Sequence, residues 1–320
     1  MPTGRGLAQD FRGRAAVSRM EQFAQVGDIR MHFQTEGHGE PMVLLMGFWG
    51  NLAWWPEPLL SYLRQHFQLI LVDNRGAGLS ERGTMPYKIK TLANDLALLL
   101  DHLGHASVHL FGVSMGGMIA QEFAVRYPQR VKRMVLANTQ GGLALNQLFS
   151  RERLRHGLRH IRQVYAAPAD FFLNLVFTPE FRASCPPDEW QTIMAAVQHR
   201  RMPGRTAREQ LLAIVRWRSL HRLHQVSSPT LVLAGGGDFM VPAACSYPIA
   251  KELPNARLVC LKDQGHGMLY EAFGAIIPYL DEFFAGPTPR SGAPLYDAES
   301  IPNVQLGTAL PSKAKSQPMV

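Results

Sequence analysis

The chain has 320 residues, of which 46% are hydrophobic and 18% are charged, and its formal net charge is +8. This balance is that of an ordinary globular protein and excludes a collagen, a coiled coil and a wholly disordered chain. No apolar run reaches the roughly 18 residues that span a bilayer, so a membrane-spanning helix is not expected. The length suits one large α/β domain with an insertion, or two small domains.

The three cysteines, Cys185, Cys245 and Cys260, lie far apart in the sequence and form no C-x-x-C motif. This usage favours a reducing compartment, so we expect a cytoplasmic protein. Residues 1–20 lack the apolar stretch of a secretory signal, and their four arginines and one aspartate are a weak match to a transit peptide. We interpret them as a flexible N-terminal extension.

Short apolar segments alternate with helical patterns through the first part of the chain. Helices are expected over 91–103, where leucines recur at helical spacing, and over about 115–126, before Pro128. Alternation of strands and helices predicts a mostly parallel sheet with right-handed crossovers. The strands predicted in this part are 29–34, 41–46, 67–72, 108–113 and 131–137.

The middle of the chain, residues 141–226, has helical patterns broken by prolines and no strand signal. It holds thirteen arginines, no lysine and six acidic residues, so most of the net positive charge lies there. We interpret it as a helical cap inserted into an α/β core made of residues 21–140 and 227–285. Its arginines either form solvated helix faces or cover an anionic or carboxylate-bearing substrate.

The sheet pattern resumes after this insertion, with strands expected at 229–234 and 256–261 and a last helix near 270–284. Residues 286–320 contain six prolines and few large apolar residues. This composition predicts a disordered or loosely docked tail.

A G-x-S-x-G motif, Gly112 to Gly116 with Ser114 at its centre, lies between a predicted strand and a predicted helix. A sharp turn there needs glycines two residues before and after the serine, because the neighbouring chain passes close to both. Such a turn places the Ser114 hydroxyl at the carboxyl edge of the sheet, where open α/β sheets bind ligands. The alternative is a purely structural turn.

A serine hydroxyl needs a base to become nucleophilic, and the base needs an orienting acid. Asp238 follows a predicted strand within a glycine-rich turn, and His266 lies in a glycine-flanked loop after the last predicted strand. Asp263, three residues before His266, is the rival acid. The order serine, aspartate, histidine is that of the α/β-hydrolases and differs from the orders in chymotrypsin and subtilisin.

From about residue 22 to residue 284 the chain resembles the lidded serine hydrolases of the α/β-hydrolase family. The matching motifs are the turn at 73–80 (DNRGAGLS), the Ser114 motif, and the loops of Asp238 and His266. The resemblance implies Ser114 as nucleophile, His266 as base and then acid, Asp238 as its orienter, and an oxyanion hole from the backbone N–H groups of Phe48 and Met115.

The third strand ends in Met-Gly, at 46–47, where members of this family usually carry His-Gly. An apolar side chain at this point favours a hydrophobic pocket. Trp49, Phe239, Met240 and Met268 flank the expected catalytic residues and are candidates for substrate binding, with core packing as the alternative.

Two other patterns are interpreted as structural. The turn at 73–80 is expected to be scaffold, because Glu81 stands where a dinucleotide-binding fingerprint would need its third glycine. His156 and His160 have a spacing that can bind a metal, but the arginines around them favour a solvated basic face.

These features predict a carboxylic ester hydrolase for small to medium, partly apolar substrates, acting through an acyl-enzyme on Ser114 and needing no cofactor or metal. The alternatives are an enol-lactonase or carbon–carbon bond hydrolase using the same residues, or a non-catalytic ligand-binding member of the fold. The expected partner is a small-molecule ester, with no nucleic acid and no membrane. Nucleic acid is not expected because the basic segment contains no recognised nucleic-acid module.

Overall fold

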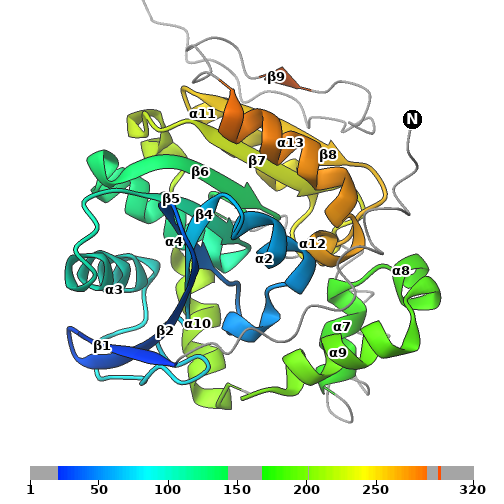
Figure 1. The fold of residues 1–320 in the computed structure, drawn as a ribbon, viewed down its shortest axis with the longest axis horizontal. Coiled ribbons are helices and arrows are strands. Elements are labelled where there is room, and N and C mark those ends of the chain that lie inside the picture. The colour runs from blue at the N-terminus through cyan, green and yellow to red at the C-terminus, as the bar shows by residue number, and fades with distance from the viewer. Residues whose placement is uncertain (1–20, 143–167, 201, 287–294, 297–320) are drawn as a thin grey trace, which may run out of the picture.

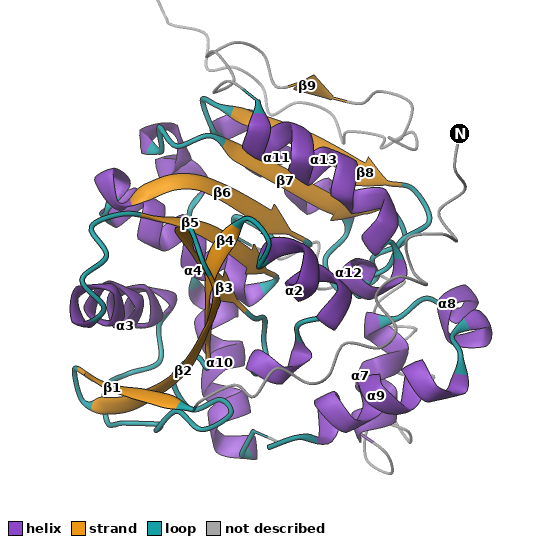
Figure 2. Ribbon diagram, in the orientation of Figure 1, coloured by secondary structure: helices purple, strands orange, loops and turns teal. Residues whose placement is uncertain are grey.

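The computed structural model describes residues 21–142, 168–200, 202–286 and 295–296. Within these residues nine strands form one sheet in the order β1-β2-β4-β3-β5-β6-β7-β8-β9 (Figures 1 and 2). Strand β2 is antiparallel to β1 and β4, and the other neighbouring strands are parallel. The strands are β1 (Gln22–Val26), β2 (Ile29–Gly37), β3 (Glu40–Leu45), β4 (Phe67–Val72), β5 (Val108–Val113), β6 (Val131–Ala137), β7 (Thr230–Gly235), β8 (Ala256–Leu261) and β9 (Leu295–Tyr296).

Helices cover both faces of this sheet, as the alternating pattern predicts (Figure 2). The helices of the core are α2 (Glu57–Leu63), α3 (Ile89–His102), α4 (Met115–Arg126), α11 (Ser246–Glu252), α12 (Met268–Glu271) and α13 (Phe273–Ala285). Among the described residues between β6 and β7, the helices are α7 (Pro168–Val176), α8 (Pro179–Ser184), α9 (Pro187–Gln198) and α10 (Gly204–Arg216).

Two hydrophobic cores lie on the two faces of the sheet. Along β3, Met42 and Leu44 belong to one core and Val43 and Leu45 to the other, as expected for side chains that alternate between faces. Helices α3, α4 and α11 pack on the first core, and α2 and α13 pack on the second. Burial on both faces explains why the central strands are almost continuously apolar.

Most of the predicted elements are present. The strands predicted at 67–72, 108–113, 131–137 and 256–261 have these bounds in the structure. Strand β1 was not predicted, because it is short and contributes only Ala24 and Val26 to the core. The last helix, expected near 270–284, is present as α13 (Phe273–Ala285). The short helix α12 (Met268–Glu271) precedes it, because the backbone leaves helical geometry at Ala272 (φ −132°, ψ 27°).

Three expectations fall wholly or largely outside the described residues. They are the N-terminal extension (1–20), the helical pattern at 151–165 with His156 and His160, and most of the tail at 286–320. Of that tail the structure describes Gly286 and strand β9, which pairs in parallel with β8 at the edge of the sheet.

Residues 168–200 and 202–226, here called the helical segment, connect β6 to β7. A third hydrophobic cluster joins α7 to α9 through residues such as Leu173, Phe177 and Ile193. In contrast, α10 packs against the first core through Ala213, and Trp217, in the turn after α10, belongs to the same core. Figure 1 accordingly shows α7, α8 and α9 grouped at one end of the molecule, apart from α10.

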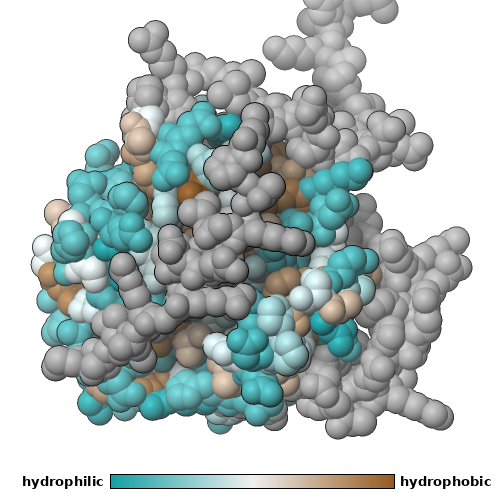
Figure 3. All heavy atoms as spheres, turned by 45° about the vertical axis from the view of Figure 1, so that its right-hand side comes forward, coloured by the Kyte–Doolittle hydropathy of each residue, from teal (hydrophilic) through white to brown (hydrophobic). Residues whose placement is uncertain are grey.

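The face of the molecule in Figure 3 is mostly hydrophilic among the residues drawn in colour, and its apolar areas are small and separate. None of the helices in the described residues combines the length and the apolar character that a membrane span requires.

Candidate active site

Ser114 occupies the turn between β5 and α4 in a backbone conformation that residues other than glycine rarely adopt (φ 54°, ψ −118°). Two hydrogen bonds hold it there. Its N–H donates to the carbonyl of Ala137 (2.9 Å), and the Thr139 hydroxyl donates to the Ser114 carbonyl (2.6 Å). Such strain costs on the order of 1–3 kcal/mol and persists where the surroundings fix it, which is typical of functional turns.

The two glycines of the motif are required by close packing. A Cβ atom at Gly112 would lie 2.5 Å from the carbonyl oxygen of Gly116. One at Gly116 would overlap the carbonyl oxygen of Leu45 at the end of β3. The sequence motif therefore has a local physical cause in this chain.

His266 and Asp238 form a buried pair in the loops that follow β8 and β7. The imidazole Nδ1 lies 2.7 Å from Asp238 Oδ2, and the exposed fractions of the two side chains are 8% and 0%. The other carboxylate oxygen of Asp238 accepts a hydrogen bond from the Val241 N–H at 2.8 Å. Asp263, the rival acid, is exposed on the loop before His266.

This pairing sets the tautomer of the imidazole. An ionised carboxylate only accepts hydrogen bonds, so Nδ1 of His266 must carry the proton that bridges to Asp238. Nε2 of the neutral ring is then left as a hydrogen-bond acceptor. A ring in this state can take a proton from a neighbouring hydroxyl group.

Ser114 and His266 line the same small cavity, which has a volume of about 70 Å³ and lies between the sheet edge and the helical segment. Among the described residues of the lining, His266 and Tyr270 are the ionisable side chains. The lining consists of Met46, Gly47, Phe48, Trp54, Pro56, Val113, Ser114, Phe172, Val176, Phe177, Ile193, Val197, Met240, His266, Gly267, Leu269 and Tyr270.

Tyr270 supplies a hydroxyl to this otherwise apolar lining. Burial raises the pKa of Tyr270, so the hydroxyl stays protonated at neutral pH. It donates to the Trp54 carbonyl at 2.9 Å. Because this hydroxyl is already engaged within the protein, the wall near it behaves as an apolar surface.

The loop after β3 passes directly beside Ser114. A Cβ atom at Gly47 would lie 3.0 Å from Ser114 Cβ, so the backbone of residues 47–48 approaches the serine closely. Within the described residues, the N–H groups of Phe48 and Met115 have no hydrogen-bond acceptor. For Met115 this follows from its position as the first residue of α4. Two free N–H donors therefore belong to the segments on either side of the hydroxyl.

The residues predicted to bind substrate have different places in the structure. Met240 lines the cavity, as does Phe48, whereas Trp49 and Phe239 are not part of the lining. The Trp49 ring packs edge-on against Phe172, at 4.9 Å between ring centroids. Met268 is fully buried in the second core, so the core-packing alternative holds for it.

Most of the remaining lining comes from residues that the sequence did not single out. Phe172, Val176 and Phe177 come from α7 and the turn after it, and Ile193 and Val197 come from α9. Their helical spacing is visible in the sequence, but that spacing describes a stripe packed on a core equally well. Only the three-dimensional arrangement shows that these stripes face the cavity.

Glu271 ties the helical segment to the loop of His266. One carboxylate oxygen accepts from the Thr178 N–H and the other from the Gly265 N–H, both at 2.7 Å. Burial raises the pKa of Glu271 despite these two donors. The Gly267 N–H also donates to the carbonyl of Val176 at 2.7 Å. The end of α7 is thereby fixed to the histidine loop.

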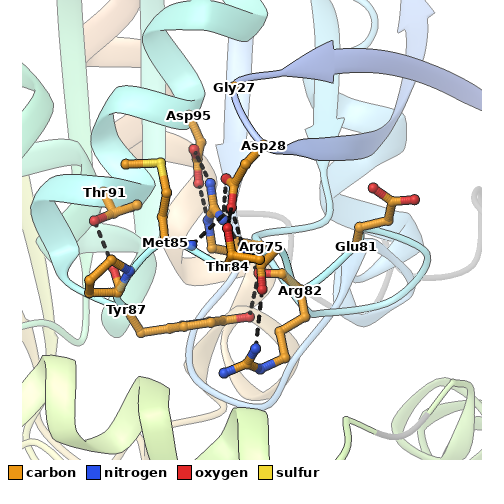
Figure 4. Close-up of polar contacts among 12 residues, drawn as sticks. Gly27, Asp28, Arg75, Glu81, Arg82, Thr84, Met85, Tyr87, Thr91 and Asp95 are labelled. Atoms are coloured by element: carbon orange, nitrogen blue, oxygen red, sulfur yellow. Dashed lines mark hydrogen bonds and ion pairs between the residues drawn. The ribbon is translucent and has the colours of Figure 1, made fainter.

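The turn at 73–80 is a scaffold, as its sequence suggests. Asp73 is buried, and its carboxylate contacts the His32 ring (2.7 Å) and accepts the N–H groups of Leu52 and Leu79. Arg75, whose side chain is fully buried, pairs with Asp95 through two hydrogen bonds of 2.8 and 2.7 Å. Figure 4 shows the pair of Arg75 and Asp95.

Arg75 also pairs with Asp28, at 2.7 Å, in the same cluster (Figure 4). No group of three potential metal-binding side chains occurs among the described residues. The pair His156 and His160 lies outside them.

Comparison with known proteins gives consistent similarities. The family model described as the alpha/beta hydrolase fold matches residues 40–273. A poly(3-hydroxyalkanoate) depolymerase from Ectopseudomonas oleovorans is 31% identical over 255 residues, which are 77% of this chain and 84% of the relative.

Solved structures of hydrolases have the same architecture. A hydrolase from Pseudomonas aeruginosa PA01 has a TM-score of 0.70 and 26% identity, covering 83% of this chain and 98% of its own. The enol-lactonase from Burkholderia xenovorans LB400 has a TM-score of 0.71 and 24% identity, covering 83% of this chain and all of its own. At that identity the second likeness concerns the fold alone.

Proposed function

Because the chain belongs to the α/β-hydrolase fold family, we propose that it is a serine hydrolase that cleaves carboxylic esters with an apolar acyl group. One observation carries this proposal. A buried Asp238–His266 pair, 2.7 Å apart, opens onto the same cavity as the strained turn that presents Ser114.

In the proposed reaction Ser114 attacks the ester carbonyl while Nε2 of His266 takes the hydroxyl proton. Asp238 holds the ring in the required tautomer and stabilises the imidazolium. The N–H groups of Phe48 and Met115 donate to the oxyanion of the tetrahedral intermediate. His266 then protonates the leaving alcohol, and a water molecule activated by the same ring hydrolyses the acyl-enzyme.

The lining of the cavity supports an apolar acyl group as the substrate feature that is recognised. Aromatic and aliphatic side chains from α7 and the turn after it, and from α9, form one wall, and Met46 and Met240 belong to the lining that contains Ser114 and His266. No arginine or lysine is found in the lining among the described residues. This favours neutral esters over the carboxylate-bearing substrates that a basic cap would suit.

The comparisons support hydrolysis as the chemistry. Poly(3-hydroxyalkanoate), which names one relative's substrate, is chemically a polyester with apolar side chains. The lactonase alternative uses the same attack on an ester carbonyl, so the two differ only in whether the leaving alcohol stays attached. Cleavage of carbon–carbon bonds beside a carboxylate is disfavoured by the uncharged lining.

A series of p-nitrophenyl esters from acetate to decanoate tests this proposal. Each buried methylene contributes about 0.8 kcal/mol, so kcat/KM should rise about fourfold per carbon until the cavity is filled. A succinate half-ester should be a poor substrate. Equal rates for all chain lengths, or preference for the half-ester, would contradict an apolar acyl site. Ser114→Ala provides the background rate.

A further inference from the structure

The end of β6 contacts all three loops that carry the proposed triad. It contacts the turn of Ser114 through two hydrogen bonds: the Ala137 carbonyl accepts the Ser114 N–H, and the Thr139 hydroxyl donates to the Ser114 carbonyl. Asn138, between these two residues, is 1% exposed and directs its carboxamide to the other two loops.

The carboxamide of Asn138 makes three hydrogen bonds to main-chain groups. Its Oδ1 accepts the N–H of Gly235, at the start of the turn that ends in Asp238 (2.8 Å). Its Nδ2 donates to the carbonyls of Gly265 and His266 itself, both at 3.0 Å. One side chain therefore fixes the separation between the loop of the acid and the loop of the base.

We propose that Asn138 is a positioning residue that holds His266 in register with Asp238 and Ser114. This inference rests on the proposed function. Other hydrogen bonds also join the two loops, among them Gly237 N–H to the Gln264 carbonyl (3.0 Å). The contribution of Asn138 is that it binds the main chain of His266 directly.

The chemistry and the backbone both explain why asparagine stands here. The site needs one acceptor and two donors on a short side chain, which an amide supplies. Its φ is +46°, a left-handed conformation that asparagine adopts more readily than most other residues. An aspartate would keep the bond from Gly235 but would set a carboxylate oxygen against two carbonyl oxygens.

Asn138→Gly removes the carboxamide while tolerating the left-handed backbone. Because a misplacement of about 1 Å can cost about a hundredfold in rate, we expect kcat to fall about 10- to 100-fold. KM should change less than about twofold, since the apolar wall that holds the acyl group is untouched. Asn255→Ala, which removes an amide bond to the Ser227 carbonyl away from the site, is the matched control.

A double-mutant cycle with Asp238→Asn separates positioning from stability. If Asn138 acts through the Asp238–His266 pair, Asn138→Gly should reduce kcat by less than about threefold in the Asp238→Asn background. An equal fold-loss in both backgrounds, or a loss confined to KM, would overturn the proposal. Failure of the proposed function would be seen separately, because Asp238→Asn alone would then leave kcat unchanged.

Asn138→Asp serves in the same cycle if the glycine variant does not fold. It keeps the size of the side chain but opposes the Gly265 and His266 carbonyls at neutral pH. We expect Asn138→Asp to lower kcat in the wild-type background and to lower it much less in the Asp238→Asn background. A kcat within about twofold of wild type for Asn138→Asp would contradict the positioning role.

Discussion

Helices α4 and α9 both have twelve residues, but the structure uses them differently. Ten residues of α4 are buried, whereas Ile193 is the buried residue of α9. Helix α4 follows Ser114 and packs into the sheet, while α9 contributes to the cavity wall. The core therefore fixes the proposed catalytic residues, and the helical segment shapes the cavity with much less burial of its own.

This difference has an energetic consequence. Regions with few buried apolar contacts open locally at a lower free energy than the core. Partly buried apolar residues on α9, such as Trp190, Met194 and Val197, belong to the cluster at the cavity. Substitutions in the helical segment should therefore alter substrate preference more than global stability, and substitutions in the core should do the reverse.

The largest effect is expected at the nucleophile, on the core side of this comparison. Ser114→Ala should lower kcat by about a thousandfold or more, because only the oxyanion donors and substrate binding remain. The free energy of unfolding should not decrease, since Ser114 Oγ fills no core position. Ser61→Ala on α2 is a control, and steady-state kinetics with urea unfolding provide both readouts.

The second effect concerns the acid that pairs with His266. Asp238→Asn should lower kcat by about 10²- to 10⁴-fold, because the amide no longer enforces the Nδ1–H tautomer. Asp263→Asn on the exposed part of the histidine loop is the matched control and should stay within about twofold of wild type. If Asp263→Asn were the more damaging substitution, the assignment of the orienting acid would be reversed.

A third, intermediate effect tests the comparison between core and wall with one substitution on each side. Ile119→Ala in α4 should reduce the free energy of unfolding by about 2–5 kcal/mol and leave the preferred acyl chain length unchanged. Ile193→Ala in α9 should reduce it less and shift the preference toward longer acyl chains. Ile119 and Ile193 are 0% and 2% exposed, so the pair is matched in burial. Equal losses of stability would remove the proposed distinction.

The smallest effect is a pH response at the two attachments of the helical segment. Glu122 on α4 binds Trp217 and Arg222, and these bonds outweigh burial and lower its pKa. A lowered folded-state pKa contributes stability above the unfolded pKa, which is lost as pH falls through the folded value. We expect Glu122→Gln to weaken the loss of stability on acidification.

Glu271, at the other attachment, should respond in the opposite sense. Burial raises its pKa, so the folded state binds the proton more tightly and stability falls as pH rises through that range. Glu271→Gln should remove this decrease. Melting temperatures of the wild type and both glutamine variants from pH 2 to pH 7 give the slope due to each glutamate, and slopes of the same sign would contradict the assignment.

The sequence predicted the sheet and the three residues of the proposed triad because their signals are local. Strands buried on both faces are apolar throughout, and the turn at Ser114 needs glycines wherever it occurs. The cavity wall was harder to predict, because the stripes on α7 and α9 read equally well as core packing. Met268 illustrates the converse, since a methionine two residues after His266 packs into the core.

Asn138 could not be identified from the sequence for a different reason. An asparagine after a strand is common in turns, and nothing local indicates that its amide reaches residues about 100 and 130 positions away. Its partners Gly235 and Gly265 become neighbours only after β6, β7 and β8 assemble side by side. Long-range polar contacts of this kind depend on the completed topology.

The most direct test of the central claim is to label the protein with a fluorophosphonate and map the adduct by mass spectrometry. We predict one adduct per chain, on the peptide that contains Ser114, and none on Ser114→Ala. Asp238→Asn should label far more slowly, because His266 then activates the hydroxyl poorly. An adduct on another serine of the wild-type protein, or ester hydrolysis that persists in a protein that does not label, would contradict Ser114 as the nucleophile.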